Sequence, residues 1–164
     1  MEKFKIIFLI ILFFNFCAKE KKEKVYDKPE GIEKFHLIES KGQIPSFELF
    51  ANNSIIKGDS IFLYNFKVIF YDSLGKKTGE LKADTGFIDR KKLNLLARNN
   101  VSLKTERESL FTKEMIWIDS LKIAKSEKDV VFYHENNVTY GKGFITKKNL
   151  KEIIIIGRVK GKGE

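Results

Sequence analysis

The sequence predicts an all-β fold, a sandwich, barrel or jelly roll of short strands that follows an N-terminal signal or anchor segment. From about residue 46 onward, apolar and polar residues alternate in about ten short runs. Gly, Asn, Asp and Lys separate the runs at intervals of roughly 8 to 12 residues, a spacing typical of sandwiches, barrels and jelly rolls. The composition, with 15 Phe and only two Pro, also favours strands.

The clearest strands are expected in order along the chain, each bounded by turn-forming residues. The turn after the second strand has Gly75 at its tip. The expected strands are 47–51, 66–72, 79–86, 94–105, 109–119, 129–137, 138–146 and 152–161.

Length and charge exclude several classes of protein. The 164 residues suffice for one domain with appendages, which can bury a core without a disulfide or a metal. The net charge of +9 would suit nucleic acid or an anionic membrane surface. However, the basic residues are spread along the chain among acidic ones, and no Arg-rich stripe, aromatic stacking motif or zinc-ligand spacing occurs. The sequence therefore predicts no nucleic-acid partner.

The N-terminal end has the pattern of an export signal. Lys3 and Lys5 precede nine consecutive apolar residues, 6–14. A membrane-spanning helix needs about 20 such residues, whereas a signal peptide needs about 7 to 15. Cys17, the only cysteine, follows. This order resembles a bacterial lipoprotein signal, which predicts a lipoprotein acylated at Cys17, for example with palmitate.

Phe16 is bulkier than the small residue that usually precedes the lipidated cysteine, so an uncleaved anchor is the alternative. Under both interpretations the chain is exported and attached to a membrane. The expected organisation is a signal peptide or lipid anchor at 1–17, a charged tether at 18–34 and a folded domain at 35–164.

The strand at 94–105 predicts which side chains face the interior. Its odd-numbered apolar residues keep their parity across the pair Asn99-Asn100, while Arg98 and Lys104 lie between them and should face water. Small alanines among larger apolar residues are expected to leave room inside the domain. The odd-numbered residues are Leu95, Ala97, Val101 and Leu103.

Three similar segments each place an Asn pair before a β-branched run, at 51–56, 98–103 and 135–140. Asn tolerates a positive φ and hydrogen-bonds its own backbone, so each pair is expected to form a corner between strands. Three such corners predict stacked, similar hairpins rather than a closed lipocalin-type barrel.

The sequence contains few residues in patterns typical of a catalytic site. Asp84-Thr85-Gly86 is the tripeptide of aspartic proteases, but that chemistry needs two aspartates and no second copy exists. The triplet is expected to form a turn in which Gly86 supplies an unusual φ. His36 and His134 have no partner at metal or triad spacing. The sequence predicts a binding or scaffold protein, with no metal, no cofactor and no enzymatic activity.

Over residues 46–161 the order of these runs resembles the LptC family, the membrane-anchored periplasmic component of lipopolysaccharide export. Asn99, Ser109 and Ile118 depart from the family pattern. The residues that carry the resemblance are Leu49-Phe50-Ala51, Val68 to Gly75, Leu81 to Gly86, Leu96 to Leu103, then Leu110, Thr112, Met115 and Trp117, and finally Gly141, Gly143, Leu150 and Ile153.

The resemblance implies a twisted, open jelly roll of antiparallel strands whose two sheets part to form an apolar groove. Such a protein, anchored to the inner membrane, takes lipopolysaccharide from an ABC transporter and passes it to the soluble bridge protein LptA. The residues expected to line the groove are Leu49, Ala51, Val68, Phe70, Leu81, Ala83, Leu95, Ala97, Val101, Leu103, Thr112, Trp117, Phe132 and Gly143.

The last run contains four consecutive isoleucines, which would be hazardous on a free strand edge. Ile154, Ile156, Arg158 and Val159 are therefore expected to pair with a strand of the soluble partner, and the strand at 47–51 with the transporter. An internal strand is the alternative. Two other functions stay open: a lipoprotein adaptor without a ligand, and a dimeric aspartic hydrolase that uses Asp84.

Overall fold

The structure, a computed structural model, describes residues 30–147, 150–157 and 159–162. It consists of a single antiparallel sheet and one short 3-10 helix, η2 (Asp119–Leu121). Consecutive strands are hydrogen-bonded neighbours from β1 to β8, and both β9 and β10 pair with β8. The predicted all-β, open jelly-roll class is confirmed. The strands are β1 (Glu30–Lys41), β2 (Ile44–Lys57), β3 (Ser60–Tyr71), β4 (Lys77–Asp89), β5 (Asn94–Lys104), β6 (Glu108–Ile118), β7 (Ile123–His134), β8 (Asn137–Lys147), β9 (Glu152–Ile155) and β10 (Lys160–Lys162).

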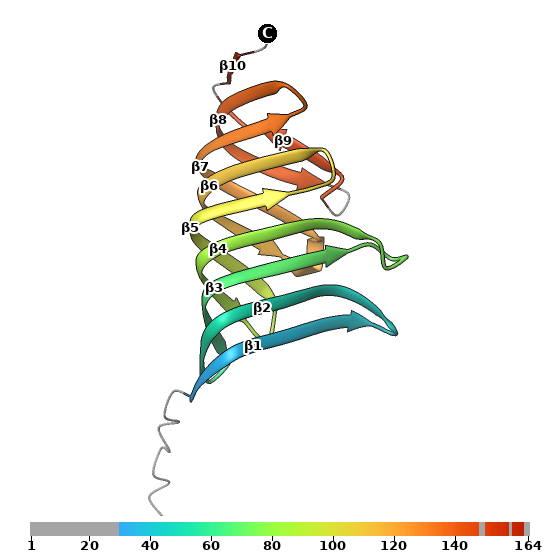
Figure 1. Ribbon diagram of the computed structural model, residues 1–164, viewed down its shortest axis with the longest axis vertical. Coiled ribbons are helices and arrows are strands. Elements are labelled where there is room, and N and C mark those ends of the chain that lie inside the picture. Colours follow the sequence, from blue (N-terminus) through green and yellow to red (C-terminus); the bar gives the residue numbers. More distant parts are fainter. Residues whose placement is uncertain (1–29, 148–149, 158, 163–164) are drawn as a thin grey trace, which may run out of the picture.

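Strands β1 to β8 are stacked in chain order along the long axis, and these long strands curve so that their two halves lie on opposite sides of the molecule (Figure 1). The sheet is therefore folded over on itself, and its inner face becomes the core. No helix among the described residues is long and apolar enough to cross a membrane.

The N-terminal boundary differs from the expected one. Residues 30–34, expected in the tether, belong to β1, which pairs with β2 along its length. The expected signal segment, Cys17 and residues 18–29 lie outside the described residues.

A bend in the middle of each long strand produces the fold. In β3 the buried Leu63 and Phe66 are separated by Tyr64 and by Asn65, which has a φ of 47°. In β5 Asn99 and Asn100 have φ values of 61° and 48° and are both exposed. Left-handed backbone is less costly for Asn than for most residues. At the bend, two or three consecutive residues therefore point away from the inner face, where regular alternation would leave only one. The apolar alternation resumes beyond the bend.

The Asn pairs do not all mark corners between strands, and that expectation was wrong for two of them. Asn52-Asn53 and Asn99-Asn100 lie inside β2 and β5, at the bends. The pair at 136–137 does lie at the turn that joins β7 to β8. A residue that tolerates left-handed backbone can bend a strand as well as end it, and sequence alone does not separate the two uses.

Asp84 also lies at a bend and not in a turn between strands, because β4 runs without interruption from Lys77 to Asp89. Its carboxylate accepts a hydrogen bond of 2.7 Å from the Asn100 side chain. The expected role of Gly86 was wrong as well, since its φ is not positive. A Cβ atom there would lie 2.6 Å from Cε1 of Phe66 and 3.3 Å from the Leu96 carbonyl oxygen, so Gly86 makes room for a core ring.

Gly86→Ala should therefore destabilise the fold by about 1 to 3 kcal/mol, because Phe66 must leave its position in a filled core. Unfolding of the full chain in a neutral detergent, followed by circular dichroism against urea, measures the loss. Gly31→Ala is the control, since nothing lies within 4 Å of a Cβ atom at that position. Equal stability of the two variants would contradict the packing role of Gly86.

Stability should also fall in acid through Glu80. The Lys77 and Lys82 ammonium groups lie 2.8 and 2.7 Å from its two carboxylate oxygens and lower its pKa from 4.5 to about 2. A depressed carboxyl pKa contributes stability above the unfolded pKa, and that stability is lost as the pH falls from 4.5 towards 2. Because the lysines are half exposed, we expect a loss of only about 1 kcal/mol between pH 6 and pH 3.

The free energy of unfolding of the wild type and of Glu80→Gln, measured at both pH values, tests this. The neutral variant should lose less stability in acid than the wild type. Parallel pH curves for the two proteins would show that the ion pairs do not contribute.

Candidate functional site

The inner face of the folded sheet carries two rows of apolar side chains that cross neighbouring strands. The strand register places the members of each row beside one another, one residue per strand. One row is Leu37, Leu49, Val68, Leu81, Leu103, Leu110 and Phe132, and the other, beyond the bend, is Ile56, Ile61, Ile88, Leu95, Trp117 and Ala124.

The structure brings the predicted groove residues together on this inner face. Thirteen of the fourteen are buried, and Phe132 is partly buried against the same core. As expected from the parity of 94–105, Ala97 and Val101 are buried while Arg98 and Lys104 are exposed.

The residues expected to line the groove did not include several other side chains of the same interior. Those in β3 at 61 and 63, in β4 at 88 and in β7 at 124 lie on strand halves outside the recognised runs, whereas the others except Leu150 lie within those runs. Leu150 follows no alternating run, so only the family resemblance pointed to it. The additional core residues are Phe47, Ile61, Leu63, Phe66, Ile88, Leu110, Met115, Ala124, Val130, Phe144 and Leu150.

The two halves of the sheet are in contact across the interior. The Phe70 ring on one half lies 4.5 Å from the Trp117 ring on the other, centroid to centroid. Large side chains also fill the space beside the alanines, since Phe66 lies between Ala51 and Ala83 in the register. Phe66 therefore occupies the inner face beside Ala51 and Ala83, contrary to the expectation that the small alanines leave room inside the domain.

Leu150 closes one margin of the interior. It is 1% exposed, and its Cδ1 atom would lie 2.9 Å from a Cβ atom at Gly79. Its neighbour Lys151 lies 3.6 Å from the Asp72 carboxylate in the turn between β3 and β4. An exposed ion pair of this kind contributes little, so the burial of Leu150 is the main attraction that holds this margin shut.

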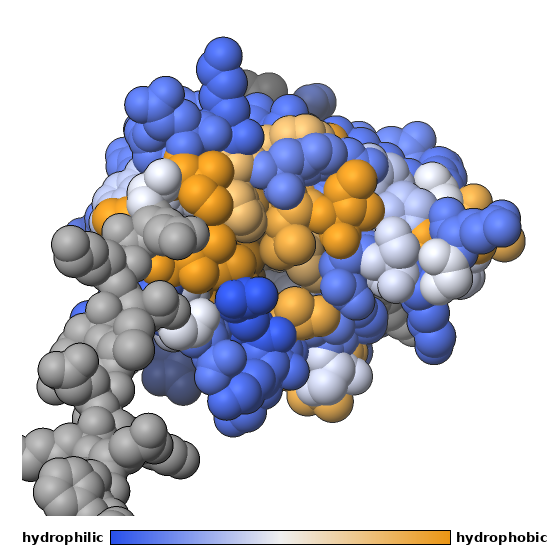
Figure 2. All heavy atoms as spheres, turned by 90° about the horizontal axis from the view of Figure 1, so that it is seen from below, coloured by the Kyte–Doolittle hydropathy of each residue, from blue (hydrophilic) through white to orange (hydrophobic). Residues whose placement is uncertain are grey.

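The β1 end of the interior is more open. Seen from below, apolar side chains gather at the centre of this face within a border of polar ones (Figure 2). Phe35 and Leu37 of β1 and Ile56 of β2 are only partly buried where they pack against the core.

The strand edges differ in part from the expectation. Phe47–Ala51 belongs to β2, which pairs with β1 on one side and β3 on the other, so that segment has no free edge. The expected contact between 47–51 and the transporter was wrong for this reason, because residues 30–41 add one more strand.

The C-terminal segment is partly paired within the chain. Ile154 of β9 lies opposite Ile145 of β8, whereas Ile156 and Val159 are about half exposed. Arg158 lies outside the described residues. The pairing of this segment with a partner strand stays a prediction.

Polar chemistry inside the described ranges is sparse. They contain no group of three His, Cys, Asp or Glu side chains that could hold a metal ion. The His36 Nε2 atom lies 3.7 Å from Glu48, and His134 Nδ1 lies 3.3 Å from Glu108, each pair on neighbouring strands. Asp84 is hydrogen-bonded to an amide, not to a second carboxyl group.

Comparison with known proteins gives one family. The family described as "Lipopolysaccharide-assembly, LptC-related" matches residues 8–164. No curated protein matches the chain. The crystal structure of LptH, the LptA-homologous periplasmic component of the lipopolysaccharide transport device of Pseudomonas aeruginosa, is similar over 84% of this chain and 96% of that one. The identity is 6% and the TM-score 0.36, which is too low to support an argument.

The family match spans nearly the whole chain and agrees with the bent, open sheet and its apolar inner face. Proteins of this family are non-enzymatic transport components, so the alternative function of a dimeric aspartic hydrolase was wrong. The chain therefore belongs to the LptC-related family and acts in the transport of lipopolysaccharide in the periplasm.

Proposed function

We propose that this chain is anchored at the inner membrane, takes lipopolysaccharide from an ABC transporter and passes it to a soluble LptA-like bridge protein. The acyl chains would travel between the two halves of the folded sheet. The observation that carries this proposal is the pair of continuous apolar rows, which run along the inner face from the β1 side to β7.

Burial of the acyl chains supplies the affinity. Removing each CH₂ group from water is worth about 0.8 kcal/mol, so partial insertion already holds a lipid without any catalytic group. A chain that enters between Phe70 and Trp117 exchanges one apolar contact for another, which keeps the cost of separating the two rings low. The halves must move apart at the margin that Leu150 closes, while the more open β1 end offers an entrance.

A ligand-free adaptor is the second candidate function. The contact between Phe70 and Trp117 favours it, because a filled interior needs no lipid to be stable. Such an adaptor would bind its protein partners through strand edges alone, including the exposed segment around Ile156 and Val159.

A photocrosslinking amino acid placed at Ala97 should capture lipopolysaccharide, whereas the same group at Lys104 should not. Ala97 faces the interior and Lys104 faces solvent on the same strand, so the pair forms its own control. The measurement is the lipopolysaccharide content of the crosslinked band from intact cells. Equal capture at both positions would contradict the groove, and capture at neither would favour the adaptor.

Anchoring through Cys17 makes a separate prediction. The intact mass of the protein extracted from membranes should correspond to residues 17–164 with added acyl chains. Cys17→Ser should keep the full-length mass and carry no acyl group. A wild-type mass that matches the unmodified 164 residues would instead indicate an uncleaved anchor.

A further inference from the structure

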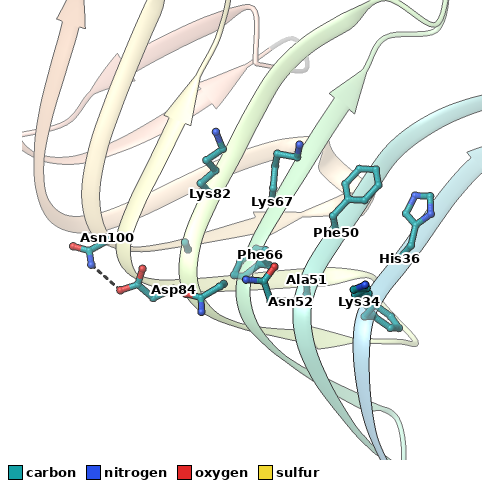
Figure 3. A pocket seen from close by; sticks show the side chains of 13 residues that line it. Lys34, His36, Phe50, Ala51, Asn52, Phe66, Lys67, Lys82, Asp84 and Asn100 are labelled. Carbon is teal, nitrogen blue, oxygen red and sulfur yellow. Dashed lines mark hydrogen bonds between the residues drawn. The ribbon is translucent and has the colours of Figure 1, made fainter.

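A cleft on the outer surface, at the bend of β1 to β5, has features of a second binding site. It measures about 570 Å³, and its lining includes Lys34, Lys67, Lys82 and the amide side chains of Asn52 and Asn65. Phe35 and Phe50 contribute apolar surface, and the buried residues Ala51, Phe66 and Ala83 also border the cleft at the bend. Figure 3 shows the side chains of Lys34, Asn52, Lys67 and Lys82 on neighbouring strands.

One wall of the cleft is a cross-strand row. The register places His36, Phe50, Lys67 and Lys82 side by side on β1 to β4. The His36 ring stacks on Phe50 at 4.3 Å, and the Lys67 ammonium lies 5.2 Å from the centroid of the same ring. Phe50 therefore holds two hydrogen-bond donors in place, which reduces the entropy that binding would cost.

The opposite wall follows the bend itself. Lys34 and Asn65 have positive φ values, and the strand register skips the row formed by Lys34, Asn52, Asn65 and Asp84. Three carboxamides, those of Asn52, Asn65 and Asn100, thus reach the cleft beside a lysine. Carboxamide N–H groups and ammonium groups are donors suited to phosphate oxygens.

The charge balance of the cleft favours an anion. No ion pair ties Lys34 or Lys67 to an acidic side chain of the described chain, whereas Lys82 lies 2.7 Å from Glu80. Asp84 is the one acidic residue among the lining residues, and its carboxylate is turned towards Asn100, at 2.7 Å (Figure 3). Two lysines without an acidic partner among the described residues, Lys34 and Lys67, therefore lie in a cleft whose one carboxylate is already hydrogen-bonded.

We propose that this cleft binds the phosphate group of an anionic membrane phospholipid, with the apolar lining against the adjoining glycerol and first acyl carbons. The cleft begins at β1, the first strand after the N-terminal segment, so the choice of a phospholipid rests on the proposed membrane attachment. The bound headgroup would orient the β1 end of the domain towards the membrane surface.

The test is a titration of the full chain, in neutral detergent, with dihexanoyl phosphatidylglycerol, followed by NMR shifts of the cleft amides. Dihexanoyl phosphatidylcholine, inorganic phosphate and a deacylated, phosphorylated glucosamine disaccharide are the comparison ligands. The double variant Lys67→Gln/Lys82→Gln should weaken binding of phosphatidylglycerol at least tenfold. The control, Lys104→Gln/Lys125→Gln, removes the same charge from exposed positions outside the cleft and should bind as the wild type does.

Equal loss in both double variants would overturn the site in favour of diffuse charge attraction. Tighter binding of inorganic phosphate or of the disaccharide than of phosphatidylglycerol would overturn the phospholipid assignment. Lipopolysaccharide capture at Ala97 should persist in Lys67→Gln/Lys82→Gln, so failure of this site and failure of the proposed transport role remain distinguishable.

Discussion

The bend in the middle of the strands is the constraint on which the rest of the structure depends. A flat sheet of ten strands would leave its apolar face in water, and no second layer is present among the described residues to cover it. Folding each strand at one point lets the sheet cover itself, with Leu63 and Phe66 on either side of one such point in β3. The cost is a left-handed residue in several strands, and Asn at 65, 99 and 100 keeps that cost low.

The same bends set the limit of what could be predicted from sequence. Period-two alternation is reliable within each half of a strand, which is why the all-β class and the inward face of 94–105 could be predicted. In a regular strand, one residue separates two neighbouring buried residues. At the bend of β3 two residues lie between Leu63 and Phe66, which reverses the parity of the buried positions. At the bend of β5 three residues lie between Ala97 and Val101, which preserves it. Long strands were therefore recognised as short runs. In β1 the parity of the inward positions reverses between Ile32 and Phe35, and the surrounding residues are rich in charge. For both reasons this strand was not recognised from the sequence.

The candidate site divides in a similar way. The groove residues could be predicted because successive side chains of a strand point to opposite faces, so the alternating apolar residues share the buried face. Contacts between the two halves could not, since the Phe70–Trp117 pair and the fit of Leu150 over Gly79 depend on how the sheet folds over. The outer cleft was also not predicted, because the residues of its cross-strand row, His36, Phe50, Lys67 and Lys82, lie on the outward parity of four strands and come together only through the register.

Pairing between consecutive strands has a consequence for how such a protein can change in size. From β1 to β8 each strand is bonded to the strands before and after it in the chain, so adding or removing one hairpin disturbs only its two neighbours. Each strand extends the stack by about 4.8 Å, which makes the length of the apolar passage a direct function of hairpin number. Duplication of a hairpin would lengthen the molecule without redesigning its interior, much as repeat proteins grow by whole units.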